Sequence, residues 1–212
     1  MKSFDLTLYL VTDRAMVKGA SLEEVVEQAV QGGVTLVQLR EKEGDTGELY
    51  QKAEKLKEIL APYHIPLIID DRIDIMLAVD AEGVHVGQSD MPARIAREMI
   101  GPDKILGVSA HNLEEALQAE KDGADYLGVG AMYPTATKKD ASCTSKAELE
   151  KIKKSVHIPV VAIGGINSHT IPDFTENSVD GFAIVSAIMA QENPKQAAGD
   201  LKKMIAKVVG GR

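Results

Sequence analysis

Short runs of consecutive apolar residues recur along the chain, and longer amphipathic segments separate them. Eight runs have the length and composition of buried strands, at residues 6–12, 35–40, 66–70, 83–87, 105–109, 126–130, 159–164 and 181–186. Because apolar side chains occupy successive positions, both faces of each strand are expected to be covered. This pattern is typical of a parallel sheet packed against helices.

The segments between these runs have the spacing of helices. In residues 22–30, for example, apolar side chains recur at positions i, i+3, i+4, i+7 and i+8. Similar patterns predict helices at residues 21–33, 46–60, 72–81, 91–100, 112–123, 145–155, 168–178 and 193–209. Pro172 interrupts one of these segments. The pair Gly32-Gly33 and Gly123 end helical segments, where a left-handed C-cap favours glycine.

Strands that alternate with helices eight times predict an α/β protein, a closed (β/α)8 TIM barrel. No Pro/Ser-rich linker or charged tail divides the chain, so residues 1–212 are expected to form one domain. An open, doubly wound sheet is the alternative if a strand has been miscounted.

Composition and charge narrow the functional class. A net charge of −8 argues against a nucleic-acid partner, which would require a basic face. An anionic substrate would need a local cationic pocket. The chain has no signal-peptide pattern, no apolar stretch long enough for a membrane span, and a single cysteine, Cys143. These features predict a cytoplasmic protein without a membrane partner, and they leave open whether it forms a homo-oligomer.

Polar and glycine residues gather where the predicted strands end, whereas the strand bodies are nearly free of charge. In a (β/α)8 barrel the loops that follow the strands converge over one mouth, where catalytic residues lie. The strand ends carry Gln38, Arg40 and Lys42; Asp70 and Asp71; His85 and Asp90; Ser109 and His111; Gly164 and Gly165; and Val185 and Ser186. The histidines have no metal-binding spacing, so His85 and His111 receive no chemical role.

Two of these strand ends suggest a phosphate site. Gly164 and Gly165 follow the seventh strand, and Val185 and Ser186 follow the eighth. In such barrels this position commonly holds a phosphate on backbone N–H groups, and glycine lets the backbone approach the oxygens closely. A plain tight turn is the alternative for the glycine pair.

A second group of residues suggests a diphosphate site. Arg40, Lys42 and Lys138 are cations on loops that can meet over the mouth, and Asp71 and Asp90 come from neighbouring strand ends. Cations with paired carboxylates favour a diphosphate bridged by Mg2+, which binds one or two carboxylates together with substrate oxygens.

Asp71 and Asp74 have a simpler interpretation, as first-turn acids that complement a helix dipole. We accept it for Asp74, with Arg72 as its ion-pair partner, whereas Asp90 favours a metal role for Asp71. The long loop after the sixth strand carries Thr135, Thr137 and Lys138 and predicts a lid over a phosphorylated substrate. A solvated loop without a function is the alternative.

Taken together, these stretches resemble the thiamin phosphate synthase family. The matching motifs are YLVTDR (9–14), VQLREK (37–42), DDRIDI (70–75), GVHVGQSD (83–90), GVSAHN (107–112), ADYLGVGAMYPTATKKDA (124–141), VVAIGGIN (160–167) and GFAIVSAI (181–188). None is specific alone, but in this order they cover nearly the whole chain and are highly specific.

The resemblance implies a transferase that joins 4-amino-5-hydroxymethyl-2-methylpyrimidine diphosphate to 4-methyl-5-(2-hydroxyethyl)thiazole phosphate. The products would be thiamin phosphate and pyrophosphate. The cofactor would be Mg2+. It also implies a dissociative reaction: pyrophosphate leaves first, and the thiazole nitrogen attacks the resulting pyrimidine cation without a protein nucleophile.

The resemblance also assigns roles to individual residues. For the pyrimidine diphosphate and its metal these are Gln38 on the pyrimidine, Arg40, Lys42 and Lys138 as the catalytic cations on the diphosphate, Ser109 in the diphosphate pocket, and Asp71 and Asp90 on Mg2+. For the thiazole phosphate they are Thr135, Thr137, Gly165, Val185 and Ser186.

Asp70 departs from the family, which usually has asparagine at this position. Beside a diphosphate, Asp70 would be an additional metal ligand or a protonated carboxyl, or it would weaken substrate binding. Two other functions are considered: a TenI-like paralogue that acts as a thiazole tautomerase or regulator, and a barrel that binds a phosphate ligand without catalysis. The presence of Lys42, Asp71, Asp90 and Lys138 favours the synthase.

Overall fold

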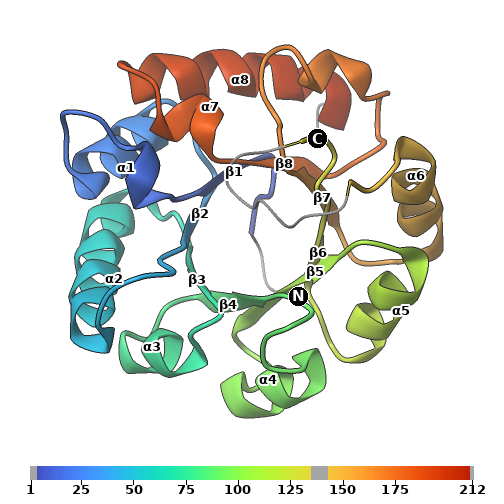
Figure 1. Ribbon diagram of the computed structural model, residues 1–212, viewed down its shortest axis with the longest axis horizontal. Helices are drawn as coiled ribbons and strands as arrows, with labels where there is room; N and C mark the ends of the chain where they lie inside the picture. The colour runs from blue at the N-terminus through green and yellow to red at the C-terminus, as the bar shows by residue number, and fades with distance from the viewer. Residues whose placement is uncertain (1–3, 135–142, 211–212) are drawn as a thin grey trace.

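The computed structural model describes residues 4–134 and 143–210, which form a closed parallel barrel ringed by helices (Figure 1). The strands are β1 (Leu8–Val11), β2 (Leu36–Leu39), β3 (Leu67–Asp70), β4 (Gly83–Val86), β5 (Ile105–Ala110), β6 (Tyr126–Val129), β7 (Val160–Ile163) and β8 (Gly181–Ile184). They pair in chain order, and β1 closes the barrel against β8. The predicted (β/α)8 barrel is confirmed, and the open sheet is excluded.

The helices surround the strands on the outside of the barrel (Figure 1). They are α1 (Leu22–Gln31), α2 (Thr46–Leu60), α3 (Ile73–Ala78), α4 (Ala93–Ile100), α5 (Leu113–Lys121), α6 (Lys146–Ser155), α7 (Ser186–Met189) and α8 (Pro194–Val209). Short 3-10 turns occur at Arg14–Met16, Ala61–Tyr63 and Ile171–Asp173. No helix within residues 4–134 and 143–210 is long and apolar enough to cross a membrane.

The helix predicted at residues 168–178 is wrong. Only the 3-10 turn Ile171–Asp173 forms there, with Pro172 inside it. Proline has no N–H for a helical hydrogen bond, and the preceding backbone is satisfied locally: the N–H of Asn167 donates to Thr170 Oγ1 at 2.9 Å. The four-residue helix α7 was not predicted, because one turn is too short to show a helical period.

The other helices begin and end where local chemistry favours it. Ser21 forms a capping box with Glu24 at the start of α1, and Asn112 and Ser145 cap α5 and α6. Gly33 and Gly123, at the ends of α1 and α5, have φ of 109° and 92°, as the sequence predicted.

Alternating residues of the strands build two separate cores. In β1, Leu8 and Leu10 face outward into the large core between the strands and the helices. Tyr9 and Val11 face inward, into a smaller cluster that fills the barrel. The barrel interior is therefore a packed core, and the residues at its upper end form the floor of the mouth.

Candidate active site

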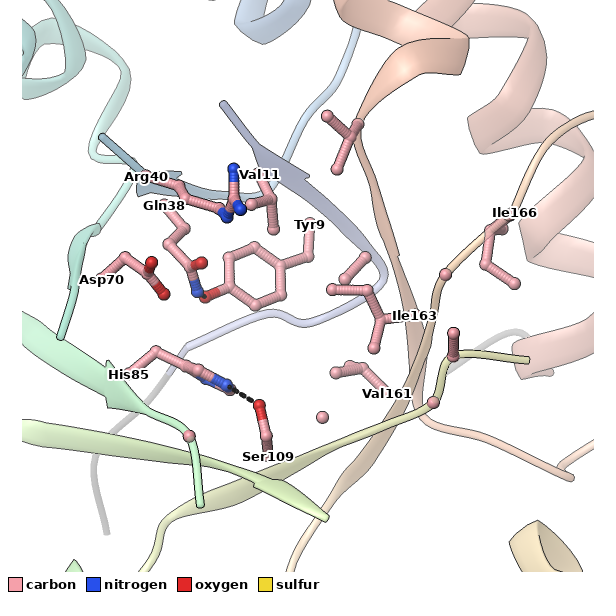
Figure 2. Close-up of a pocket in the computed structure, with 18 of the residues that line it drawn as sticks. Tyr9, Val11, Gln38, Arg40, Asp70, His85, Ser109, Val161, Ile163 and Ile166 are labelled. Atoms are coloured by element: carbon pink, nitrogen blue, oxygen red, sulfur yellow. Dashed lines mark hydrogen bonds between the residues drawn. The ribbon is translucent and has the colours of Figure 1, made fainter. Parts of the chain in front are cut away.

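Ten of the thirteen predicted site residues line one pocket at the mouth of the barrel (Figure 2). They are Gln38, Arg40, Lys42, Asp70, Asp71, Asp90, Ser109, Gly165, Val185 and Ser186. All ten lie at or just beyond the carboxyl ends of strands, so the barrel topology brings them together. The remaining three, Thr135, Thr137 and Lys138, lie outside the described residues.

The acidic corner of the pocket depends on an unusual backbone conformation. Asp70 ends β3, and Asp71 follows it with φ of 60°, in the left-handed region. The N–H of Asp71 donates to the carbonyl oxygen of His85 at 2.8 Å, which ties the turn to β4. Residues with positive φ are uncommon outside glycine, although aspartate tolerates this region better than most. Such strain often accompanies a functional position.

Lys42 bridges the two carboxylates of this corner. Its Nζ lies 2.7 Å from Asp70 Oδ2 and also forms a hydrogen bond with Asp71 Oδ2. Burial alone would lower the pKa of Lys42, but the charges of Asp70 and Asp71 and the hydrogen bonds to them raise it above its ordinary value. Lys42 therefore stays an ammonium group, held by carboxylates.

The surroundings of Asp71 disfavour its ionised form. Burial, the charge of Asp70 and a hydrogen bond with the Asp90 carboxyl together raise the pKa of Asp71 to about 6, although Lys42 acts in the opposite direction. Asp90 Oδ2 also accepts from the N–H of Gly87 at 2.8 Å, which turns the loop after β4 toward the pocket. The corner holds more negative charge than its neighbours neutralise.

These carboxylates fit a magnesium ion. Asp71 and Asp90 lie close enough for one to hydrogen-bond the other, and a divalent cation relieves such crowding of like charge. Asp70 Oδ2 is buried, and Lys42 Nζ is the group that approaches it, at 2.7 Å. Residues 4–134 and 143–210 contain no cluster of three or more His, Cys, Asp or Glu arranged for a metal. The set suits Mg2+ shared with substrate oxygens rather than a cage made by the protein alone.

Arg72 and Asp74 do not line the pocket. Their side chains form an ion pair at 2.6 Å at the start of α3, as the sequence predicted. The charged stretch after β3 therefore divides into two parts: Asp70 and Asp71 face the pocket, and the next charged pair belongs to the helix start.

Across the pocket, Gly164 and Gly165 follow β7 with φ of 92° and 69°. A Cβ atom on Gly165 would lie 2.6 Å from the Cβ of Tyr133, so the position has no room for a side chain. Val185 and Ser186 border the same side of the pocket, where α7 begins. Closely approachable backbone beside a helix start is the arrangement that the sequence predicted for a phosphate.

Arg40 extends over the pocket from the end of β2. Its backbone N–H donates to Thr12 Oγ1 at 3.0 Å, and its guanidinium lies 3.7 Å from the Asp13 carboxylate. The contact is long for a salt bridge, so the guanidinium retains donors for an anionic ligand.

Sequence reasoning placed His85 at a strand end without a chemical role, and it missed Tyr9 and the apolar residues of the pocket. The floor includes Tyr9 and His85, and the apolar side chains of Val161, Ile163 and Ala183, here called the apolar wall, line the same pocket. Figure 2 shows Val161 and Ile163 across the pocket from Asp70. His85 Nε2 and Ser109 Oγ form a hydrogen bond of 2.9 Å (Figure 2). The inward alternation of Tyr9 in β1 was the signal available, but a buried tyrosine in an apolar strand is indistinguishable from ordinary core.

A sequence profile of the thiamine monophosphate synthase family matches residues 8–188 of the chain. The chain belongs to this family. It is 58% identical over 204 residues to the thiamine-phosphate synthase of Clostridium botulinum (strain Eklund 17B / Type B), covering 96% of both chains. It is 55% identical over 203 residues to the thiamine-phosphate synthase of Methanobrevibacter smithii, covering 96% of this chain and 97% of the relative.

A solved structure supports the same conclusion at the level of the fold. The thiamine phosphate pyrophosphorylase from Pyrococcus furiosus superimposes with a TM-score of 0.88 at 43% identity, covering 97% of this chain and 98% of that one. The resemblance found in the sequence motifs is therefore confirmed, and the chain is a member of a transferase family.

Proposed function

We propose that this protein is a thiamin phosphate synthase, in a barrel of one domain. It would join the pyrimidine diphosphate to the thiazole phosphate and release pyrophosphate. One observation carries the proposal: a group of acidic and cationic residues, a glycine pair and several apolar side chains line one pocket. This arrangement suits two phosphorylated substrates with a ring-to-ring bond forming between them.

The diphosphate of the pyrimidine substrate would bind to Arg40 and Lys42, and to Lys138 from the loop after β6. Gln38 and the apolar wall would hold the pyrimidine ring, and Ser109 would contact the diphosphate. The bidentate guanidinium of Arg40 suits phosphate oxygens, whereas the ammonium of Lys42 acts as a movable point charge.

The thiazole phosphate belongs on the other side of the pocket. Gly165, Val185 and Ser186 would hold its phosphate, with Thr135 and Thr137 from the loop after β6. The two phosphorylated ends of the substrates would then point apart, and their rings would meet over the apolar wall.

Asp71 and Asp90 would hold Mg2+, and Asp70 lies beside them. When bound, the ion supplies charge neutralisation to the leaving diphosphate. Lys42 is paired with Asp70 and Asp71. Binding of the metal and the diphosphate would release Lys42 from these carboxylates and let its ammonium contact the diphosphate. The Lys42 ammonium, which otherwise pairs with the two carboxylates, would thereby stabilise the leaving group.

The protein would act by positioning and electrostatics rather than by a covalent intermediate. Arg40, Lys42 and Lys138 would stabilise the negative charge that develops as pyrophosphate leaves. The apolar wall of Val161, Ile163 and Ala183 would keep water from the pyrimidine cation until the thiazole nitrogen attacks it. These roles require no activated Ser or Cys.

Pyrophosphate release from the two substrates tests the proposal. A synthase releases pyrophosphate and forms thiamin phosphate, a tautomerase converts a thiazole phosphate without pyrophosphate, and a binding protein does neither. High identity to proteins named as synthases, over nearly the full length, favours the first outcome. The absence of pyrophosphate release by the wild-type protein would exclude it.

Variants connect the activity to the assigned corner. Asp71→Ala and Lys138→Ala are expected to lower kcat by about a hundredfold or more, since each removes a charge that stabilises the leaving group. Asp74→Ala is the matched control, because Asp74 is paired with Arg72 outside the pocket lining. Near-normal turnover in both Asp71→Ala and Lys138→Ala would contradict the assignment.

We propose a cytoplasmic location and no nucleic-acid or membrane partner, in keeping with the acidic net charge of −8. The partners of the chain would be its two small-molecule substrates. Fractionation of cells that express the tagged protein tests the location.

A further inference from the structure

A chain of hydrogen bonds crosses the barrel interior beneath the pocket. Gln38 Nε2 lies 2.6 Å from the Tyr9 hydroxyl, which lies 2.7 Å from the Tyr126 hydroxyl. Tyr126 then contacts His85 Nδ1 at 3.1 Å, and His85 Nε2 contacts Ser109 Oγ at 2.9 Å. We call these five residues the core relay. Its two ends, Gln38 and Ser109, line the pocket (Figure 2).

With His85 neutral, the orientation of the Gln38 amide sets the direction of every bond in the core relay. The amide nitrogen of Gln38 can only donate, so the Tyr9 hydroxyl accepts from it and must donate its own hydrogen to Tyr126. Tyr126, already an acceptor, then donates to His85 Nδ1. An imidazole that accepts at Nδ1 carries its proton at Nε2, and this N–H donates to Ser109 Oγ.

Burial keeps this direction intact. Tyr9 and Tyr126 are 1% and 0% exposed. Burial raises the pKa of both hydroxyls well above the ordinary value, so each keeps the one hydrogen that the relay needs. Because the five groups form one continuous chain, reversal of one bond would require reversal of all of them.

Two glycines in the strands make room for the core relay. A Cβ atom on Gly107 in β5 would lie 2.3 Å from the Tyr126 hydroxyl and 2.5 Å from His85 Nδ1, and one on Gly128 in β6 would lie 3.2 Å from His85 Cε1. Glycine weakens a strand, and its presence there commonly marks a close approach by another group. Here the group that approaches is the middle of the relay.

We propose that Tyr9, Tyr126 and His85 are positioning residues that present the Gln38 carbonyl oxygen and the Ser109 hydroxyl hydrogen to the pocket. Because Gln38 gives its N–H to Tyr9, its free end is an acceptor, which selects a ring that bears an N–H donor. Because Ser109 accepts from His85, its hydrogen is directed to an anion. This inference rests on the proposed function, which assigns the pyrimidine to Gln38 and the diphosphate to Ser109.

The tautomer of His85 tests the direction of the relay without any substrate. In 15N-labelled protein, nitrogen–proton correlation spectra distinguish an Nε2–H from an Nδ1–H imidazole, and a His85→Gln variant assigns the signals. We expect the Nε2–H form alone in the wild-type protein. The Nδ1–H form would mean that the Gln38 amide is turned and every bond runs in the opposite direction, which would overturn the proposal.

Removal of single hydroxyls tests the positioning role. Tyr126→Phe is expected to let His85 populate both tautomers and to lower kcat/KM for the pyrimidine diphosphate about tenfold, the effect of losing one buried hydrogen bond. KM for the thiazole phosphate should not change. Tyr50→Phe is the control, because the Tyr50 hydroxyl donates a hydrogen bond to Glu54 on the surface of α2 and lies outside the pocket lining.

Tyr9→Phe provides a second variant if Tyr126→Phe does not fold. It frees the Gln38 amide to rotate, so the preference in binding for the 4-amino pyrimidine diphosphate over its 4-oxo analogue should fall about tenfold, measured without thiazole phosphate. An unchanged preference, or equal losses for both substrates of the reaction, would overturn the positioning role. Failure of the proposed function would instead abolish pyrophosphate release in the wild type and leave the His85 tautomer as expected here.

Discussion

The raised pKa of Asp71 predicts that Mg2+ binding depends strongly on pH between 5 and 7. Burial, the charge of Asp70 and a hydrogen bond with Asp90 move this pKa from 3.8 to about 6. A carboxylate must be ionised to bind a metal, so protons and Mg2+ compete for Asp71. With a pKa of about 6, Asp71 is about nine-tenths ionised at pH 7 and about one-tenth ionised at pH 5. The affinity for Mg2+ should therefore fall about tenfold over this range.

Isothermal titration calorimetry with Mg2+, in pairs of buffers with different ionisation enthalpies, measures both the affinity and the protons released. At pH 6 about half a proton should leave for each ion bound. Asp70→Asn removes one of the charges that raise the pKa of Asp71, so its midpoint should move to lower pH. Asp74→Asn, in the separate pair with Arg72, should leave the midpoint unchanged.

An affinity that stays constant from pH 7 to pH 5 would refute the reasoning, because an Asp71 of ordinary pKa would be ionised throughout that range. A midpoint that Asp70→Asn does not move would show that Asp70 is not the source of the shift. No binding of Mg2+ to the wild-type protein would remove the metal site from the proposal.

Asp71→Asn should abolish turnover yet raise the free energy of unfolding at pH 7 by about 1–3 kcal/mol. The folded-state pKa exceeds the unfolded one, so this carboxyl stabilises the fold below pH 3.8 and loses that contribution as the pH rises through about 6; equal denaturation midpoints at pH 7 would contradict this. Gly165→Ala should raise KM for the thiazole phosphate at least about tenfold, because its φ is 69° and its Cβ would lie 2.6 Å from that of Tyr133. Gly47→Ala, with open space around its Cβ, should leave KM unchanged and stabilise α2 by about 0.5–1 kcal/mol; equal kinetics in the two glycine variants would refute the steric argument. Arg97→Ala should lower the free energy of unfolding by about 2–4 kcal/mol with kcat within about twofold, since its guanidinium bonds the backbone that precedes β5 and β6, opposite the mouth; a large loss of kcat in folded protein would contradict that separation.

The barrel could be predicted from the sequence because its pattern is redundant. Eight apolar runs appear at regular intervals, and the strands form within each predicted range to within two residues, except that β5 extends one residue further. The wrong helix at residues 168–178 shows what such a pattern lacks. Its sequence has the right length between strands, but Pro172 and local side-chain bonds around Asn167 stop the helix, and these effects act below the scale of a period.

Pocket residues could be predicted from the sequence where a charged side chain follows a buried strand, but not where the side chain fits an ordinary apolar core. Asp70, Asp71 and Arg40 are charges at the ends of buried strands, and burial of a charge is costly enough to signal a role. Tyr9 and Tyr126 are equally part of the pocket floor and its support, but they lie in apolar strands as ordinary core residues do. Their function depends on which hydroxyl meets which nitrogen, and this follows only from the closure of β1 against its neighbours and the distances across the barrel.

The structure also changes how the charges of the corner are understood. The sequence suggested that Arg40 and Lys42 are available to bind a diphosphate, yet Lys42 is paired with Asp70 and Asp71. Among the described lining residues three carboxylates lie beside two cations, so the charge of Lys42 is already matched by carboxylates before a diphosphate binds. A divalent cation held by these carboxylates would compete with Lys42 for them and would leave its ammonium available to a diphosphate. Asp70, the position at which the chain departs from the pattern that the resemblance implies, would strengthen both the hold on Lys42 and the attraction for a cation. Metal and diphosphate should therefore each favour the binding of the other.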